Sequence, residues 1–128
     1  MTNVNTSAVI ETLSERINQT MKCFYDRAPA KEKLPFCVLG GIKDNDLSAG
    51  NLVRFEIDLW GDDKDPAACE EIESSCDRLQ NALDNAIIGK DGIFLGHIQY
   101  ENRDPSADRE TDLLHRRLFF TARIFYYS

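Results

Sequence analysis

Apolar and polar residues alternate most regularly between positions 53 and 60. Val53, Phe55, Ile57 and Leu59 are apolar, and the residues between them are mostly charged. This alternation predicts a strand with one buried and one solvated face. Residues 34–39, which end before Gly40-Gly41, and residues 93–103 have β-type composition and predict two further strands. The polar residues at 44–46 and 48–50 predict a turn.

Two segments have apolar residues at steps of three and four, the spacing of an amphipathic helix. The first spans residues 9–24, carries Ile10, Leu13, Ile17, Met21 and Phe24, and can be capped by Asn5, Thr6 or Ser7. The second spans residues 65–86, opens on Asp65-Pro66, and carries Cys69, Ile72, Cys76, Leu79 and Leu83.

Residues 113–127 predict a last strand that is apolar on both faces. Its even positions 118–126 are apolar, and five of the twelve aromatic residues of the chain lie in it. An antiparallel strand of a small domain usually keeps one face solvated. Either the helices of this chain or a neighbouring chain must therefore cover the second face. The candidate interface residues are Phe119, Phe125, Tyr127, Arg117 and Arg123.

The order of these elements is helix, two strands, helix, two strands. It predicts one α+β domain over residues 1–128, with the topology α-β-β-α-β-β. In this fold a four-stranded antiparallel sheet has both helices packed on one face, because each helix has a single apolar stripe. The length of 128 residues suits one such domain.

The net charge of −7 is unevenly distributed. Residues 61–86 contain eight acidic and two basic residues, a charge of −6. A solvated helix face is the usual reason for such a run. We expect an acidic surface made of Asp62, Asp63, Glu70, Glu71, Glu73 and Asp77. Because nucleic-acid affinity comes mainly from Lys and Arg, no specific nucleic-acid binding is expected; Arg116, Arg117 and Arg123 are the only argument for it.

No catalytic constellation is apparent. His97 and His115 lie in no nucleophile or metal motif, no phosphate-binding loop is present, and no metal or cofactor is expected. Cys23, Cys37, Cys69 and Cys76 are expected to be reduced thiols. No run of about 20 apolar residues and no leader segment is found, so we expect a soluble, intracellular protein without membrane contact.

The sequence resembles the small tail-completion proteins, also called tail-terminator or head-tail joining proteins, of tailed bacteriophages and prophages. The resemblance covers nearly the whole chain. The residues that carry it are Leu34-Pro35-Phe36-Cys37-Val38-Leu39-Gly40, the strand Leu52–Gly61 that ends near Trp60, the helix Ala67–Leu83, and Arg103-Asp104 before the last strand.

This resemblance implies a non-enzymatic structural protein that forms a ring, typically a hexamer, at the head-proximal end of the tail tube. The ring would end the tail and join it to the head. Its partners would be other copies of the chain, the tail-tube protein and the head-connector protein. The protein would belong to the virion and assemble in the cytoplasm of the bacterial host. An acidic inner surface would repel passing DNA.

Two alternatives remain open from the sequence. One is a minor capsid or head-closure protein of the same virion. The other is a small oligomeric α+β ligand-binding protein or enzyme with a site between subunits, built from His97, Tyr100 and Arg103.

Overall fold

The computed structural model describes residues 4–47, 49–105 and 113–127. Ser48 of the expected turn and residues 106–108 of the expected loop lie outside this description. The elements in chain order are α1 (Thr6–Asn18), β1 (Cys23–Tyr25), β2 (Phe36–Leu47), β3 (Gly50–Asp62), α2 (Ala68–Leu83), β4 (Ile87–Lys90), β5 (Phe94–Asp104) and β6 (Leu113–Tyr126).

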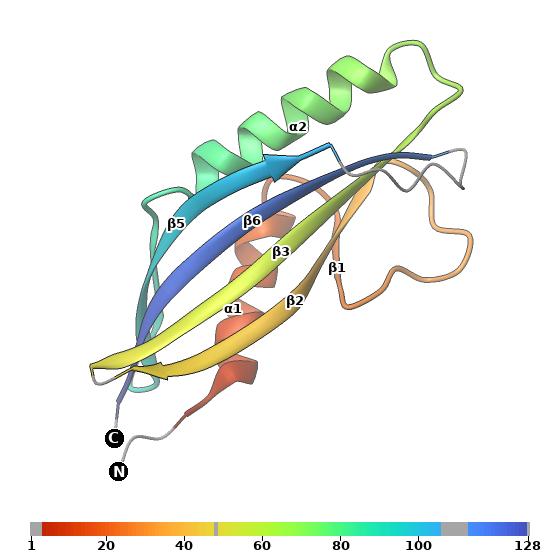
Figure 1. Cartoon of the computed structure of the whole chain (residues 1–128). Coiled ribbons are helices and arrows are strands. Elements are labelled where there is room, and N and C mark those ends of the chain that lie inside the picture. The colour runs from red at the N-terminus through yellow and green to blue at the C-terminus, as the bar shows by residue number, and fades with distance from the viewer. Residues whose placement is uncertain (1–3, 48, 106–112, 128) are drawn as a thin grey trace.

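The strands form one strongly curved sheet, a half-barrel, in the order β1-β2-β3-β6-β5-β4 (Figure 1). The expected α-β-β-α-β-β fold with a four-stranded antiparallel sheet is therefore wrong, because the chain has three strands after each helix. The sheet has two additional edge strands, β1 and β4, and it is mixed because β1 runs parallel to β2. All other neighbouring strands are antiparallel.

One hydrophobic core joins both helices to a single face of the sheet. It contains Val9, Leu13 and Ile17 of α1, and Ile72, Cys76, Leu79 and Leu83 of α2. The sheet contributes the odd positions of β3 from Val53 to Leu59 and the even positions of β6 from Leu118 to Tyr126. The expected alternation of both strands is therefore confirmed. The opposite side of the sheet is called the outer face. It points towards the viewer in Figure 1, where α1 crosses behind the sheet.

Helix α1 ends six residues before the predicted end at Phe24. The side chain of Asn18 accepts a hydrogen bond from Cys23 N at 3.0 Å and donates one to Cys23 O at 3.3 Å. Asn18 thereby bonds the backbone of the first residue of β1 and turns the chain out of the helix. Phe24 lies in β1 and contacts Phe36 on β2 with a ring separation of 5.9 Å. At the other end, Asn5 caps α1 by accepting a hydrogen bond from Ala8 N.

Strand β2 continues through the first part of the expected turn, residues 44–46. Gly41, with φ of +60°, lies at a bulge between Gly40 and Lys43, and the pairing with β3 then resumes up to Leu47 and Gly50. Two of the polar residues that suggested a turn are hydrogen-bonded to β3. Asp44 and Asp46 accept hydrogen bonds from Asn51 Nδ2 at 2.7 and 3.1 Å. The chain therefore reverses direction between Leu47 and Gly50, in the second part of the expected turn.

Helix α2 begins at Ala68, slightly later than expected. Asp65 accepts a hydrogen bond from Ala67 N at 2.9 Å, but Ala67 itself is the N-cap and makes no side-chain cap. The apolar stripe of the helix is placed as predicted, except that Cys69 is exposed.

Candidate interaction surfaces

Four of the five candidate interface residues lie side by side on the outer face of β6. Arg117, Phe119, Arg123 and Phe125 occupy the odd positions of this strand, opposite the positions that enter the core. Tyr127 follows the last residue of the strand, and its backbone N–H donates to Ile93 O at 2.9 Å. Four of the candidates therefore share one face, spread along β6 from Arg117 to Phe125.

Arg117 is held within the chain. Its Nε donates to Asp58 Oδ1 at 2.7 Å, and Glu56 Oε2 lies 3.6 Å away. The hydrogen bond to Asp58 raises the pKa of Arg117 above its ordinary value. His115 Nε2 also donates to Asp58 Oδ1, at 2.6 Å, and its ring stacks on Trp60 at 4.0 Å. In this part of the outer face the charges of Arg117, Glu56 and Asp58 thus largely compensate one another within the chain.

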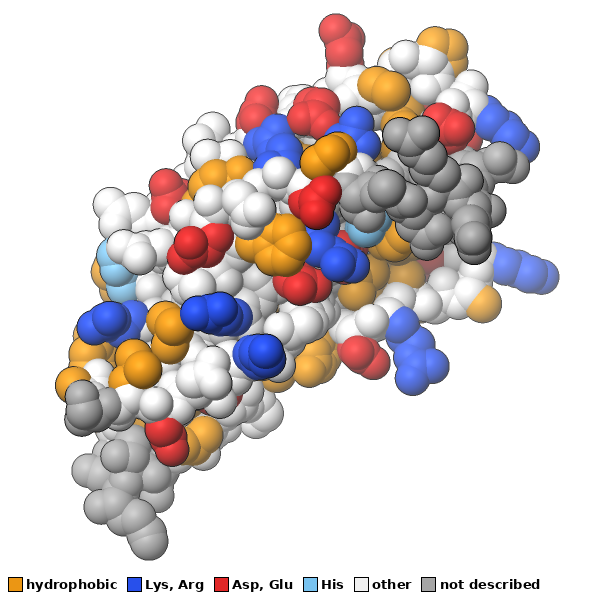
Figure 2. All heavy atoms as spheres, viewed as in Figure 1, with side chains coloured by type: hydrophobic (Ala, Val, Ile, Leu, Met, Phe, Trp, Pro, Cys, Tyr) orange, Lys and Arg blue, Asp and Glu red, His pale blue; other side chains and the backbone are white. Residues whose placement is uncertain are grey.

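The end of the outer face near the C-terminus is apolar and basic. Ile87, Leu95, Phe125 and Tyr127 are 63 %, 45 %, 47 % and 48 % exposed. Leu95 and Phe125 are register partners, so their side chains adjoin. Arg123, which is also exposed, lies two residues before Phe125 on β6 and pairs with His97 of β5. We call Ile87, Leu95, Arg123, Phe125 and Tyr127 the aromatic end. Figure 2 shows hydrophobic, lysine and arginine side chains together at this end of the molecule.

The six candidate acidic residues divide into two groups. Glu73 and Asp77 each bind Arg103 of β5 at 2.9 Å, and Glu73 also binds Arg116 of β6. Burial would lower the pKa of Arg103, but the hydrogen bonds of Asp77 and Glu73 outweigh burial and raise it. These two acids therefore fasten α2 to the sheet.

The other four acids are Asp62, Asp63, Glu70 and Glu71. They are exposed around the N-terminal end of α2, and within the described residues none of them forms an ion pair. The remaining acidic surface is thus smaller than the sequence alone suggests, and it lies at one end of the molecule.

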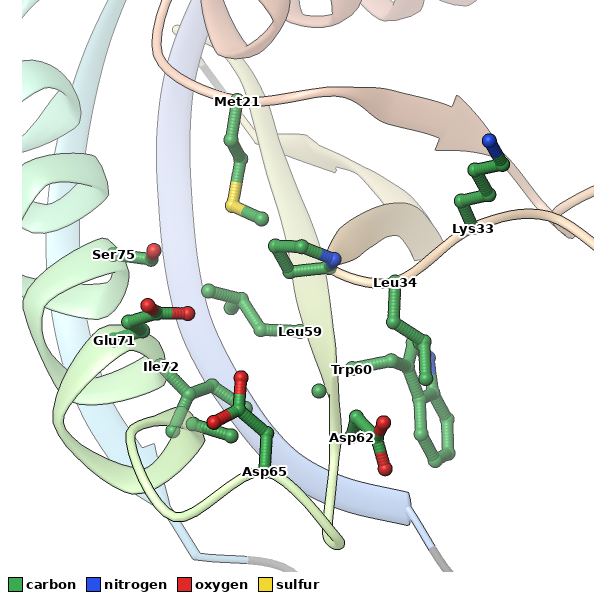
Figure 3. A pocket seen from close by; sticks show the side chains of 13 residues that line it. Met21, Lys33, Leu34, Leu59, Trp60, Asp62, Asp65, Glu71, Ile72 and Ser75 are labelled. Atoms are coloured by element: carbon green, nitrogen blue, oxygen red, sulfur yellow. The ribbon is translucent and has the colours of Figure 1, made fainter.

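A pocket of about 340 Å³ opens at this acidic end, between α2, the end of β3 and the segment before β2 (Figure 3). Its apolar lining includes Met21, Leu34, Pro35, Leu59 and Ile72. The carboxylates of Asp62, Asp65 and Glu71 also line it. Lys33 is its one lysine or arginine, and Figure 3 shows its amine turned away from the three carboxylates. The pocket thus combines an apolar floor with a negative rim.

The alternative site made of His97, Tyr100 and Arg103 is not assembled within the subunit. His97 lies on the outer face and bonds Asn85 at 2.6 Å, whereas Tyr100 packs against Phe120 at 5.6 Å. Arg103 is bound to α2. Nor do the three arginines suggested for nucleic acid form one patch of uncompensated charge, because Arg116 binds Glu73 and Arg117 binds Asp58.

The cysteines are free thiols, as expected. Burial raises the pKa of Cys76 to about 11, and the hydrogen bond with Cys23, together with burial, raises that of Cys37. In the described part of the chain no three His, Cys, Asp or Glu side chains are close enough to bind a metal ion. Neither described helix is long and apolar enough to span a membrane.

Sequence reasoning missed a polar network near the hairpin of β2 and β3. Asp44 accepts hydrogen bonds from Thr6 Oγ1 at 2.8 Å and from the Tyr126 hydroxyl at 2.9 Å, in addition to the bond from Asn51. The network joins the start of α1 to the end of β6. No sequence signal pairs these residues, which are up to 120 positions apart.

We expect Tyr126→Phe to weaken the fold most near neutral pH and less above pH 10. Burial, together with the Asp44 carboxylate, raises the pKa of Tyr126 from 10 to about 12. The unfolded chain therefore loses this proton first, so the contribution of Tyr126 to stability is complete below pH 10 and falls as the pH rises to 12. The variant should lose about 1–2 kcal/mol at pH 7. Urea unfolding of both proteins between pH 7 and 11.5 measures this, and a constant difference over that range would contradict it.

The sequence matches a protein family. A family model described as "Tail completion protein gp17" matches residues 4–125. Among solved structures, a chain of the "Virion of native gene transfer agent (GTA) particle" has a TM-score of 0.67 at 18 % identity, covering 91 % of this chain and 97 % of that chain. At this identity the likeness supports the fold alone. No curated protein matches the sequence.

Proposed function

Because the chain belongs to the tail completion protein gp17 family, a structural family of phage tails, we propose that it forms a ring at the head-proximal end of the tail tube. The family resemblance expected from the sequence is thus confirmed. In the proposed role, the ring ends the tail at its proper length and joins it to the head. Its partners are further copies of this chain, the tail-tube protein and the head-connector protein. It assembles in the cytoplasm of the host, and the resemblance implies a hexamer.

The observation that carries self-association is the aromatic end. Its four apolar side chains are roughly half exposed or more, and two of them are adjacent register partners. Clustered exposed apolar side chains are typical of protein contact surfaces. Both helices lie on the opposite face of the sheet and do not cover the aromatic end.

We also infer that the protein is not an enzyme. The hydrogen bonds of the two histidine rings support this inference. In the described residues they go to Asn85 and Asp58, and neither ring bonds a serine, threonine or cysteine. Such a bond is what activates a nucleophile in covalent catalysis.

The proposal predicts a multimer that dissociates when the aromatic end is altered. We expect the wild-type protein to form rings in mass photometry, alone or with tail-tube protein of the same phage, and to appear at one end of the tubes in electron micrographs. Phe125→Asp should yield folded monomers, because a carboxylate replaces an apolar contact. Tyr25→Asp is the matched control, since Tyr25 is also 47 % exposed but lies on the edge strand β1.

A wild-type protein that stays monomeric with and without tube protein would contradict the proposal. Binding to the connector or to capsid protein, but not to tubes, would instead favour a minor capsid or head-closure role.

A further inference from the structure

The two ends of the subunit are unlike and complementary. The pocket with its negative rim lies where β3 ends, since Asp62 pairs with Leu113 at the start of β6. The aromatic end lies at the other end of the same two strands, where Asn51 pairs with Ile124. One end therefore offers an apolar cavity with carboxylates, and the other offers apolar side chains with cations.

Three exposed cations, Lys43, Arg54 and Arg123, lie near the aromatic end, and Glu56 and Glu101 line the same hollow as Lys43 and Arg54. Lys43 and Arg54 are register partners on adjacent strands and both are exposed. Like charges directly opposite each other destabilise a sheet. Arg123 is also exposed, and within the described residues none of the three forms an ion pair. An external group that carries carboxylates would remove this repulsion.

The pocket has an excess of negative charge. Asp62, Asp65 and Glu71 line it without an ion pair in the described chain, and the one cation in its lining, Lys33, has its amine turned away from them (Figure 3). Its floor of Leu59 and Ile72 suits an apolar or aromatic side chain, and a volume of about 340 Å³ has room for one.

We propose that the aromatic end of one copy docks into the pocket of the next copy, with Arg123 meeting the carboxylates of the rim. This inference rests on the proposed ring. Because the two surfaces differ, the contact is head-to-tail, and repetition of such a contact gives a ring when the rotation from copy to copy closes. Pairing two aromatic ends instead would place cations against cations. The rim carboxylates thus meet a neighbouring copy rather than line a channel.

Charge reversal at each surface tests this docking. Glu71→Arg and Arg123→Glu should each weaken self-association about tenfold or more, because each places like charges across the contact. A 1:1 mixture of the two variants, and a double variant that carries both changes, should restore wild-type assembly. Glu71 is chosen because its side chain makes no hydrogen bond within the described chain. Sedimentation velocity over a concentration series, free and with tail-tube protein, gives the association constants.

Matched controls are Glu15→Arg and Arg27→Glu, which reverse exposed charges elsewhere. Thermal unfolding confirms that each variant is folded; if a reversal prevents folding, Glu71→Gln and Arg123→Gln replace the pair and should each weaken assembly severalfold. Unchanged assembly of either variant, or no restoration in the mixture and the double variant, would overturn the docking while leaving the ring intact. Loss of tube binding alone would assign the pocket to the tube protein. A monomeric wild type would overturn the ring itself.

Discussion

Replacing Phe120 with alanine is expected to lower the free energy of unfolding by about 3–5 kcal/mol, the usual loss for a fully buried phenylalanine. Phe120 is 1 % exposed and lies at the centre of the core face of β6. Its ring stacks on Phe55 at 5.2 Å and meets the edge of Tyr100 at 5.6 Å. Truncation removes both ring contacts and leaves a cavity, which the surrounding strands cannot close. Urea denaturation followed by circular dichroism measures the loss.

The adjacent residue provides the control. Phe119 has the same side chain but lies half-buried on the outer face. Phe119→Ala should therefore cost the subunit less than about 1 kcal/mol. Equal losses at the two positions would mean that the outer face is packed as tightly as the core, and that the assignment of the faces of β6 is wrong.

Gly50→Ala is expected to destabilise the folded chain by about 2–3 kcal/mol. The backbone conformation of Gly50 is unfavourable for alanine, and neighbouring atoms of β6 leave no room for a Cβ. Gly50 has φ of +99°. A Cβ at this position would lie 2.7 Å from Ile124 O, a backbone atom of β6, and 3.1 Å from the ring of Phe125. The hairpin of β2 and β3 would have to move away from β6. Thermal and urea unfolding measure the loss of stability.

Gly92→Ala is the matched control. Gly92 also has a positive φ, of +76°, but a Cβ there would meet nothing within 4 Å. We expect a loss of about 1 kcal/mol, from the backbone conformation alone. If both variants lost the same free energy of unfolding, the close approach of Gly50 to β6 would not contribute to the cost of the substitution.

The long helices and strands could be predicted from the sequence because apolar residues recur in each of them many times at the same spacing. Strand β3 alternates over its whole buried stretch, and α2 repeats its apolar residues over four turns. The edge strands β1 and β4 have only three and four residues, too few for a period to show. Phe24 of β1 also happens to continue the spacing of α1, so the helix was predicted too long.

The positions of the candidate interface on β6 could be predicted from alternation, but their partners could not. Alternation assigns a residue to a face and leaves the register between strands undetermined. Only the register shows that Asp58 lies opposite Arg117 and can hold it. Similarly, the sequence shows eight acids near α2, but not that Arg103 and Arg116 reach back to two of them.

The short edge strands bear on how the subunit behaves before it is incorporated into a particle. A long, flat, unpaired strand is a template on which further chains can add and grow into fibres. Here β1 and β4 offer little free backbone, and the part of β2 beyond β1 has a bulge at Gly41 and carries Lys43, Asp44 and Asp46. Stacking of sheets edge to edge is therefore disfavoured. In the proposed ring, neighbouring copies are therefore expected to contact one another through side chains rather than through paired strands.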